Sequence, residues 1–189
     1  MNTRKLSILS GIIAMSLTVL ACKMNIGGPD YPTPAIPIST EAVGELQSSL
    51  ETAVADGTVS GQITLTFTEP QLTSFLFYKL QAQSLPVITN PQVYLQDGQL
   101  LVYGTARKGY LEATARIILT AGVDDQGQLK IELTSADFGP LPVPNGLMEI
   151  ITASIQEAYT GALGPVATGF RLESVTIADG TMTIIGQTK

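Results

Sequence analysis

The sequence of 189 residues contains no histidine, no tryptophan and a single cysteine. Without histidine, Ser-His-Asp and Cys-His catalysis and every histidine-ligated metal site are excluded. One cysteine cannot form a disulfide within the chain. Carboxylates remain as acid–base groups, and Glu69 is the one in a suggestive position, at the start of an expected helix, where the helix dipole accounts for it. We therefore expect a protein that is not an enzyme, with no catalytic residue, no metal site and no cofactor.

Basic residues are scarce as well, with 10 Lys and Arg against 16 Asp and Glu. From Cys22 onward there are 8 basic and 16 acidic residues, a net charge of −8. Nucleic-acid affinity comes largely from neutralising phosphates, so we expect no nucleic-acid partner. The lack of a basic run also argues against binding anionic lipid head groups through a polybasic face. Protein partners cannot be inferred from these counts.

Residues 1–21 are typical of an export signal, because a basic start precedes the uncharged apolar segment 6–20, which is short for a membrane span. The segment ends in Val19-Leu20-Ala21-Cys22, which resembles the lipobox of bacterial lipoproteins, with Leu20 as a departure. The resemblance implies cleavage before Cys22 and acylation of that residue with chains such as palmitate. We then expect a protein anchored to the cell membrane on its extracytoplasmic side. A plain secretory signal with a chance cysteine and an uncleaved anchor are the alternatives.

Residues 22–37 hold six glycines and prolines. Such a composition excludes a helix or a central strand and predicts a semi-extended tether. At roughly 3 Å per residue the tether would let the domain stand up to ~45 Å from its anchor. We expect a single domain over residues 38–189.

The stretch 61–80 changes its period half-way and organises the rest of the chain. Its first half alternates apolar residues with threonines, the pattern of a half-buried strand. Thr68 can then cap a helix, and Pro70 suits its first turn. Apolar residues follow at spacings of three and four: Leu72, Phe75, Leu76 and Leu80. Because Phe77 and Tyr78 fall outside this stripe, we expect a helix that is apolar on more than one side and is covered by more than one surface.

Cap and turn signals divide the remaining chain. Ser39 or Thr40 begins a helix that continues to about Asp56. Asp-Gly pairs at 97–98 and 179–180 join alternating strands, which predicts two hairpins. The expected strands are 92–96, 99–106, 109–122, 129–138, 170–178 and 181–186. A further helix is expected at 145–162. The order predicts an α+β fold, in which a long curved antiparallel sheet wraps around a helix, with further helices packed at the N-terminus and before the last hairpin.

The two Asp-Gly hairpins resemble each other in sequence over 93–104 and 175–186. Both run from alternating apolar residues through Asp-Gly into a strand that ends in glycine. Shared turn chemistry explains such a likeness, and an internal structural repeat explains it equally well.

Four motifs in the expected order resemble the LmeA-like phospholipid-binding family, which is similar to the tubular lipid-binding (TULIP) superfamily. The motifs are Leu65-Thr-Phe-Thr-Glu-Pro-Gln-Leu72, Leu95-Gln-Asp-Gly98, Gly139-Pro-Leu-Pro-Val-Pro144 and Ser174-Val-Thr-Ile-Ala-Asp-Gly-Thr-Met-Thr-Ile-Ile-Gly186. The resemblance implies a curved sheet around a long helix, with an apolar cavity between them that holds acyl chains. It transfers no catalytic residue. The lipobox and the Pro-rich segment are additions to the pattern, and they favour action close to a membrane.

Lipid binding in such a cavity would use apolar side chains of the helix and the sheet. The candidate lining residues are Leu72, Phe75, Leu76, Phe77, Leu80, Leu111, Ile117, Leu133, Ile151 and Ile155. For each of them, ordinary core packing is the competing interpretation. The alternative function is a non-enzymatic envelope scaffold or assembly lipoprotein with a solid core and no ligand.

Overall fold

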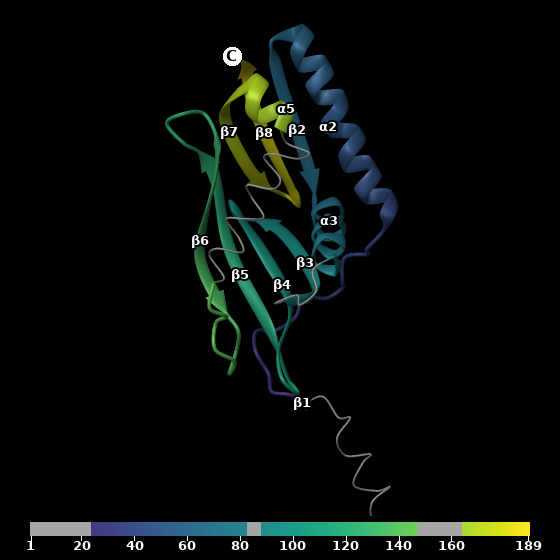
Figure 1. Ribbon diagram of the computed structural model, residues 1–189, viewed down its shortest axis with the longest axis vertical. Helices are drawn as coiled ribbons and strands as arrows, with labels where there is room; N and C mark the ends of the chain where they lie inside the picture. The colour runs from purple at the N-terminus through teal and green to yellow at the C-terminus, as the bar shows by residue number, and fades with distance from the viewer. Residues whose placement is uncertain (1–23, 83–87, 147–163) are drawn as a thin grey trace, which may run out of the picture.

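The computed structural model describes residues 24–82, 88–146 and 164–189, and it has two antiparallel sheets and three helices in these ranges (Figure 1). The elements are β1 (Met24–Asn25), α2 (Thr40–Ser60), β2 (Gln62–Thr68), α3 (Glu69–Gln81), β3 (Ile88–Gln96), β4 (Gln99–Lys108), β5 (Leu111–Val123), β6 (Leu129–Asp137), α5 (Gly164–Gly169), β7 (Phe170–Ala178) and β8 (Thr181–Thr188). The α+β class is confirmed.

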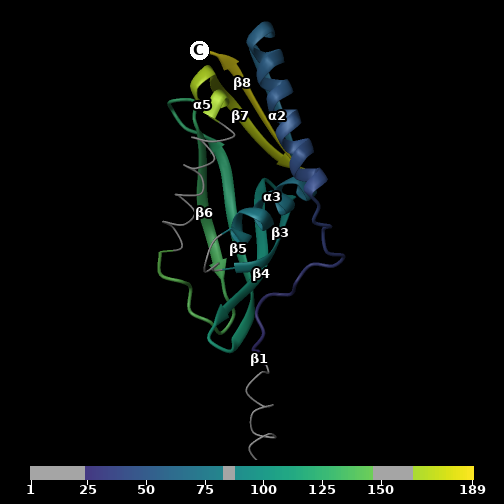
Figure 2. The same ribbon diagram turned by 45° about the vertical axis from the view of Figure 1, so that its right-hand side comes forward.

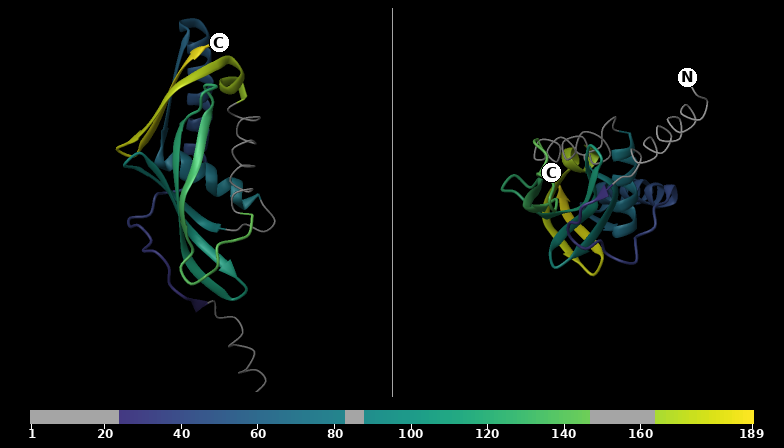
Figure 3. Two further views of the ribbon diagram at one scale, coloured as in Figure 1. Left: turned by 90° about the vertical axis from the view of Figure 1, so that its left-hand side faces the viewer. Right: turned by 90° about the horizontal axis from the view of Figure 1, so that it is seen from below.

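The larger sheet has the order β1-β5-β4-β3, with β6 also paired to β5, and it curls into a half-barrel (Figure 3). The smaller sheet has the order β2-β8-β7. All pairings are antiparallel except that of β1 with β5. Helix α2 runs beside the smaller sheet. Helix α3 lies below the smaller sheet and packs against β3 (Figures 1 and 2).

The strand-to-helix switch at residue 68 forms as its residue types predict. Strand β2 alternates between exposed and buried positions. Thr68 then caps α3 through a reciprocal pair of hydrogen bonds, in which its Oγ1 accepts from the Gln71 N–H and the Gln71 Oε1 accepts from the Thr68 N–H. Pro70 occupies the first turn, where its missing N–H costs nothing.

The two Asp-Gly hairpins contact each other at their turns. The Gly98 N–H donates to the Ile177 carbonyl at 3.1 Å, and the Gly180 N–H donates to the Leu95 carbonyl at 3.0 Å. Each glycine therefore bonds the residue two positions before the aspartate of the other hairpin. Asp97 and Asp179 have φ values of 53° and 51°, as the turn requires. The two turns that resemble each other in sequence thus form a reciprocal contact that joins the two sheets.

The described residues form two core clusters, and the first of them spans this joint. The first combines α2, the smaller sheet and the ends of β3 and β4 near the joint, with Leu50, Phe67 and Leu95 among its members. The second lies at the far end of the larger sheet and includes Ile88 and Phe138. Both sheets therefore contribute to the first cluster, and the half-buried Val102 and Leu119 pack against both clusters.

The N-terminal segment lies along the larger sheet instead of reaching away from it. Met24 and Asn25 pair in parallel with the start of β5, and the Thr114 N–H donates to the Gly27 carbonyl. Further along, the buried side-chain amide of Gln92 bonds both the N–H and the carbonyl of Ile36. The expected reach of ~45 Å is therefore wrong for residues 24–36. An extended Pro-rich backbone has unpaired polar groups, and the sheet supplies their partners.

Two helix ends differ from the expectation. Helix α2 continues to Ser60, because Gly61 at φ 80° provides the left-handed cap and its N–H bonds the Gly57 carbonyl. A short helix, α5, forms from Gly164 onward, where an end was expected. The described part of the expected helix 145–162 is a turn at 145–146; residues 147–162 lie outside the described ranges, as does the export signal 1–21. The boundary at residue 38 stays a prediction.

Candidate functional site

Helix α3 buries polar side chains completely and apolar ones only in part. Thr73 and Ser74 are 0% exposed and Gln71 is 8% exposed. The expected apolar stripe is half-buried along its whole length. The sequence pattern was therefore misleading about which side of the helix is most enclosed.

Thr73 and Glu69 of α3 satisfy the outer edge of β3, whereas Ser74 accepts from the Ser39 N–H and Gln71 bonds Thr68. The Val93 N–H donates to Thr73 Oγ1 at 2.9 Å, and the Leu95 N–H donates to Glu69 Oε1 at 2.8 Å. Glu69 and Thr73 are four helical residues apart, a rise of about 6.0 Å, and their partners are two strand residues apart, about 6.8 Å. The match lets a helix complete the hydrogen bonds of an edge strand, which protects that edge from pairing with other chains.

Glu69 also holds the joint between the sheets. Its N–H bonds the Gly180 carbonyl at 3.3 Å, while its carboxylate bonds the Leu95 N–H of the other hairpin. The carboxylate therefore has a structural role in addition to its place at the helix N-terminus, which was the role expected from the sequence.

Half-buried apolar side chains of α3 and of the larger sheet pack against the first core cluster. We call this set of residues the apolar face. Its members are Leu72, Phe75 and Leu76 from α3, Val102 from β4, Leu119, Ala121 and Val123 from β5, and Leu129 at the N-terminal end of β6. None of these side chains is ionisable, so the surface can bind a ligand only by burying apolar area.

Strand register explains why the sheet residues share one side. Leu119 pairs with Leu133 of β6 and with Leu100 of β4, and Val123 pairs with Leu129. Directly opposed residues in a sheet project to the same side, and alternate residues along β5 do so as well. The alternation of β5 continues through Ala121 and Val123, a signal in the sequence that our list of lining residues did not use.

The remaining predicted lining residues are placed in several environments. Phe77 and Leu80 are half-buried on α3 and belong to neither core cluster, and the Phe77 ring packs edge-on against Tyr78. Ile117 is 5% exposed inside the second cluster, and Leu133 packs against that cluster. Leu111 is 37% exposed at the start of β5, beside Met24. Ile151, Ile155 and Cys22 lie outside the described residues.

The opposite side of the larger sheet is polar and aromatic. Tyr103 contacts the rings of Tyr31 and Tyr94 edge-on, at centroid distances of 6.3 and 5.8 Å. Burial, with a smaller contribution from Tyr94, raises the pKa of Tyr31 to about 12. Burial and then Glu69 raise the pKa of Tyr94. The N-terminal segment covers this side, so the apolar face is the side of the sheet with half-exposed aliphatic residues.

Within the ranges that the structure describes, no cluster of three or more His, Cys, Asp or Glu residues could hold a metal. No helix in the same ranges has both the length and the apolar character needed to cross a bilayer.

Comparisons with known proteins give little. No protein-family model matches the chain, and no curated protein matches it. Among solved structures, a crystal structure of lipopolysaccharide binding protein matches with a TM-score of 0.24 and 13% sequence identity, over 80% of this chain and 48% of that chain. This chain thus spans about half the length of that protein. Such a likeness fixes neither the fold nor the ligand of this chain.

Proposed function

We propose that this protein is a membrane-anchored, extracytoplasmic lipoprotein whose domain binds phospholipid or other acyl chains against the apolar face. The observation that carries the proposal is the apolar face itself, in which α3 and three strands contribute half-buried aliphatic and aromatic side chains without an ionisable group. The LmeA-like motifs and the lipobox at Cys22 support it from the sequence.

The energy available from such a surface is sufficient for ligand binding. Each methylene removed from water contributes about 0.8 kcal/mol. Ten buried methylenes would contribute roughly 8 kcal/mol before the cost of association is subtracted. A free energy of about 8 kcal/mol corresponds to a dissociation constant of about 1 μM, and the cost of association makes the binding weaker than that.

Native mass spectrometry of the protein, gently extracted from expressing cells, tests the proposal. We expect a mass increment that corresponds to a phospholipid or fatty acid and that disappears on denaturation. Ala121→Phe adds a ring to the apolar face and should reduce that increment. Ala55→Phe, at an exposed position of α2, is the matched control and should leave it unchanged. Thermal unfolding of both variants separates lost binding from lost folding.

A protein that takes up neither phospholipid nor fatty acid would contradict the proposal. The scaffold function would then be favoured, and one observation already supports it. Ile117, a predicted lining residue, is 5% exposed and belongs to the second core cluster. Part of the expected cavity lining is therefore ordinary core, which is what a solid-core lipoprotein requires.

A further inference from the structure

Three exposed apolar residues and two exposed basic residues of this acidic chain lie together at one end of the molecule. Met24 is 61% exposed, Tyr110 is 69% exposed and Leu111 is 37% exposed. Arg107 and Lys108, both exposed, end strand β4 directly before the turn that leads through Tyr110 to Leu111. We call these five residues the tip.

The tip is a single surface, because its two chain segments are paired. Met24 lies opposite Leu111 in the β1–β5 register, and the Met24 N–H donates to the Tyr110 carbonyl at 3.0 Å. Figure 1 shows β1 and the β4–β5 turn together at the bottom of the molecule, and the end of α2 at the top. The exposed apolar side chains of the turn therefore lie beside Met24 at the extremity of the long axis.

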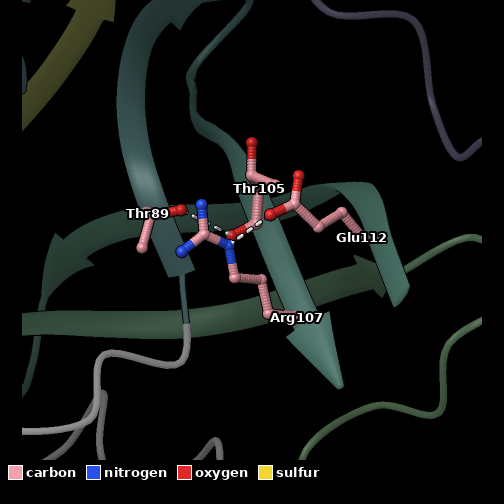
Figure 4. A network of polar contacts seen from close by, with 4 residues as sticks. All are labelled: Thr89, Thr105, Arg107 and Glu112. Atoms are coloured by element: carbon pink, nitrogen blue, oxygen red, sulfur yellow. Dashed lines mark hydrogen bonds and ion pairs between the residues drawn. The ribbon is translucent and has the colours of Figure 1, made fainter. Parts of the chain in front are cut away.

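Charge distinguishes the tip from the rest of the surface. The stretch 105–111 holds two basic residues and no acid, in a chain of net charge −8 from Cys22 onward. The nearest acid in the register is Glu112, whose Oε1 lies 2.6 Å from Arg107 Nε (Figure 4). Lys108 is exposed, so its ammonium can reach a partner of negative charge. The sequence-based argument against a polybasic face holds for the whole chain but does not detect this local pair.

We propose that the tip docks on the surface of the anchoring bilayer, with Tyr110, Leu111 and Met24 in the interfacial region and Lys108 on anionic head groups. Tyrosine is enriched at membrane interfaces, and a basic residue near an anionic leaflet is attracted to it. Met24 follows Cys22 by two residues, which span at most ~7 Å. Because residues 24–36 are bound to the sheet, an anchor at Cys22 brings the tip to the membrane first.

The orientation of the tip rests on the anchoring proposed above, but the contact does not require a lipid in the domain. The absence of tryptophan provides a direct probe. In the Tyr110→Trp variant, the only tryptophan lies at the tip. In Val59→Trp, it lies at a position that is 91% exposed near the C-terminal end of α2, at the other end of the molecule.

Both variants, purified from expressing cells, are mixed with vesicles of phosphatidylcholine and phosphatidylglycerol that carry brominated acyl chains. We expect a blue-shifted and quenched emission for Tyr110→Trp and unchanged emission for Val59→Trp. Equal emission in the two variants, or no change in either, would overturn the proposal. A protein that fails to retain lipid in native mass spectrometry but shows this quenching would contradict the ligand proposal alone.

A second pair of variants tests the charge. Lys108→Gln, made in the Tyr110→Trp background, should weaken docking on the anionic vesicles about fivefold, because one basic residue is lost from the interface. Lys130→Gln removes an exposed lysine that pairs with Glu132 at the other end of β5, and it should leave docking unchanged. Equal weakening by both substitutions would overturn the assignment to the tip, since it would show a response to net charge.

Discussion

Removal of the Glu69 carboxylate should weaken the joint between the two sheets. The Leu95 N–H that it bonds belongs to a residue that is 1% exposed, so no water can replace the acceptor. A hydrogen bond to a charged group contributes about 1.5–3 kcal/mol. An acidic residue in the first helical turn adds about 0.3–1 kcal/mol. Glu69→Ala should therefore lower the free energy of unfolding by about 2–4 kcal/mol.

Glu69→Gln separates the hydrogen bond from the charge. The amide oxygen can still accept from the Leu95 N–H, so we expect a loss of only about 1 kcal/mol. Urea unfolding should show a lower midpoint with an unchanged m-value for both variants. The midpoint temperature of thermal unfolding should fall by roughly 5–15 °C for Glu69→Ala.

Glu45→Ala is the control, because Glu45 is exposed in the middle of α2. It should change the unfolding free energy by less than about 0.5 kcal/mol. Hydrogen exchange at the Leu95 amide should accelerate in Glu69→Ala and not in Glu45→Ala. If the two alanine variants unfold at the same urea concentration, the structural role assigned to the carboxylate is wrong.

Three other predictions concern the larger sheet. A Cβ added at Gly104 would lie 2.1 Å from a side-chain carbon and 3.0 Å from a backbone oxygen of β3. Gly104→Ala should therefore lower the free energy of unfolding, measured in urea, by about 1–3 kcal/mol. Gly122→Ala, where the added Cβ has nothing within 4 Å, should lower it far less. Gln92→Ala should release the N-terminal segment and expose it to limited proteolysis, and Gln96→Ala, at an exposed position, should not. Burial raises the pKa of Tyr31 from 10.0 to about 12. The neutral Tyr31 side chain therefore contributes fully to stability below pH 10, and this contribution is lost between pH 10 and 12. The unfolding midpoint of Tyr31→Phe should decline less steeply than that of the unchanged protein over the same interval.

The local elements were predictable because their signals lie within a few residues. Thr68 and Pro70 identify the helix start, and the Asp-Gly pairs at 97–98 and 179–180 identify both hairpins. Each signal acts through adjacent backbone groups, so no knowledge of distant partners is needed.

The contacts between elements were not predictable in the same way. The bond from Leu95 to Glu69 and the bonds of Gln92 to Ile36 join residues 26 and 56 positions apart. Their donors and acceptors come together only after the sheet has formed, and periodicity carries no information about them. Thr73 illustrates the consequence, because this polar residue outside the apolar stripe is one of the most buried side chains.

The candidate site was predicted in part for the same reason. Helical spacing identified Leu72, Phe75 and Leu76, which the structure brings together in the apolar face. Of the predicted sheet residues, Leu111 lies at the tip and Ile117 in the second core cluster, and the lining role of all these residues stays a prediction. Which alternate residues of a long strand face a given helix depends on where that helix packs, and the strand pattern alone does not specify this.

Photo-crosslinking with a fatty acid that carries a diazirine on its chain tests most directly whether acyl chains lie against the apolar face. We predict labelled peptides from α3 and from the part of β5 that contains Leu119 to Val123, and loss of the label when unmodified fatty acid is added in excess. Labelling that unmodified fatty acid does not displace, or labelling confined to the tip, would contradict a lipid site between α3 and the sheet.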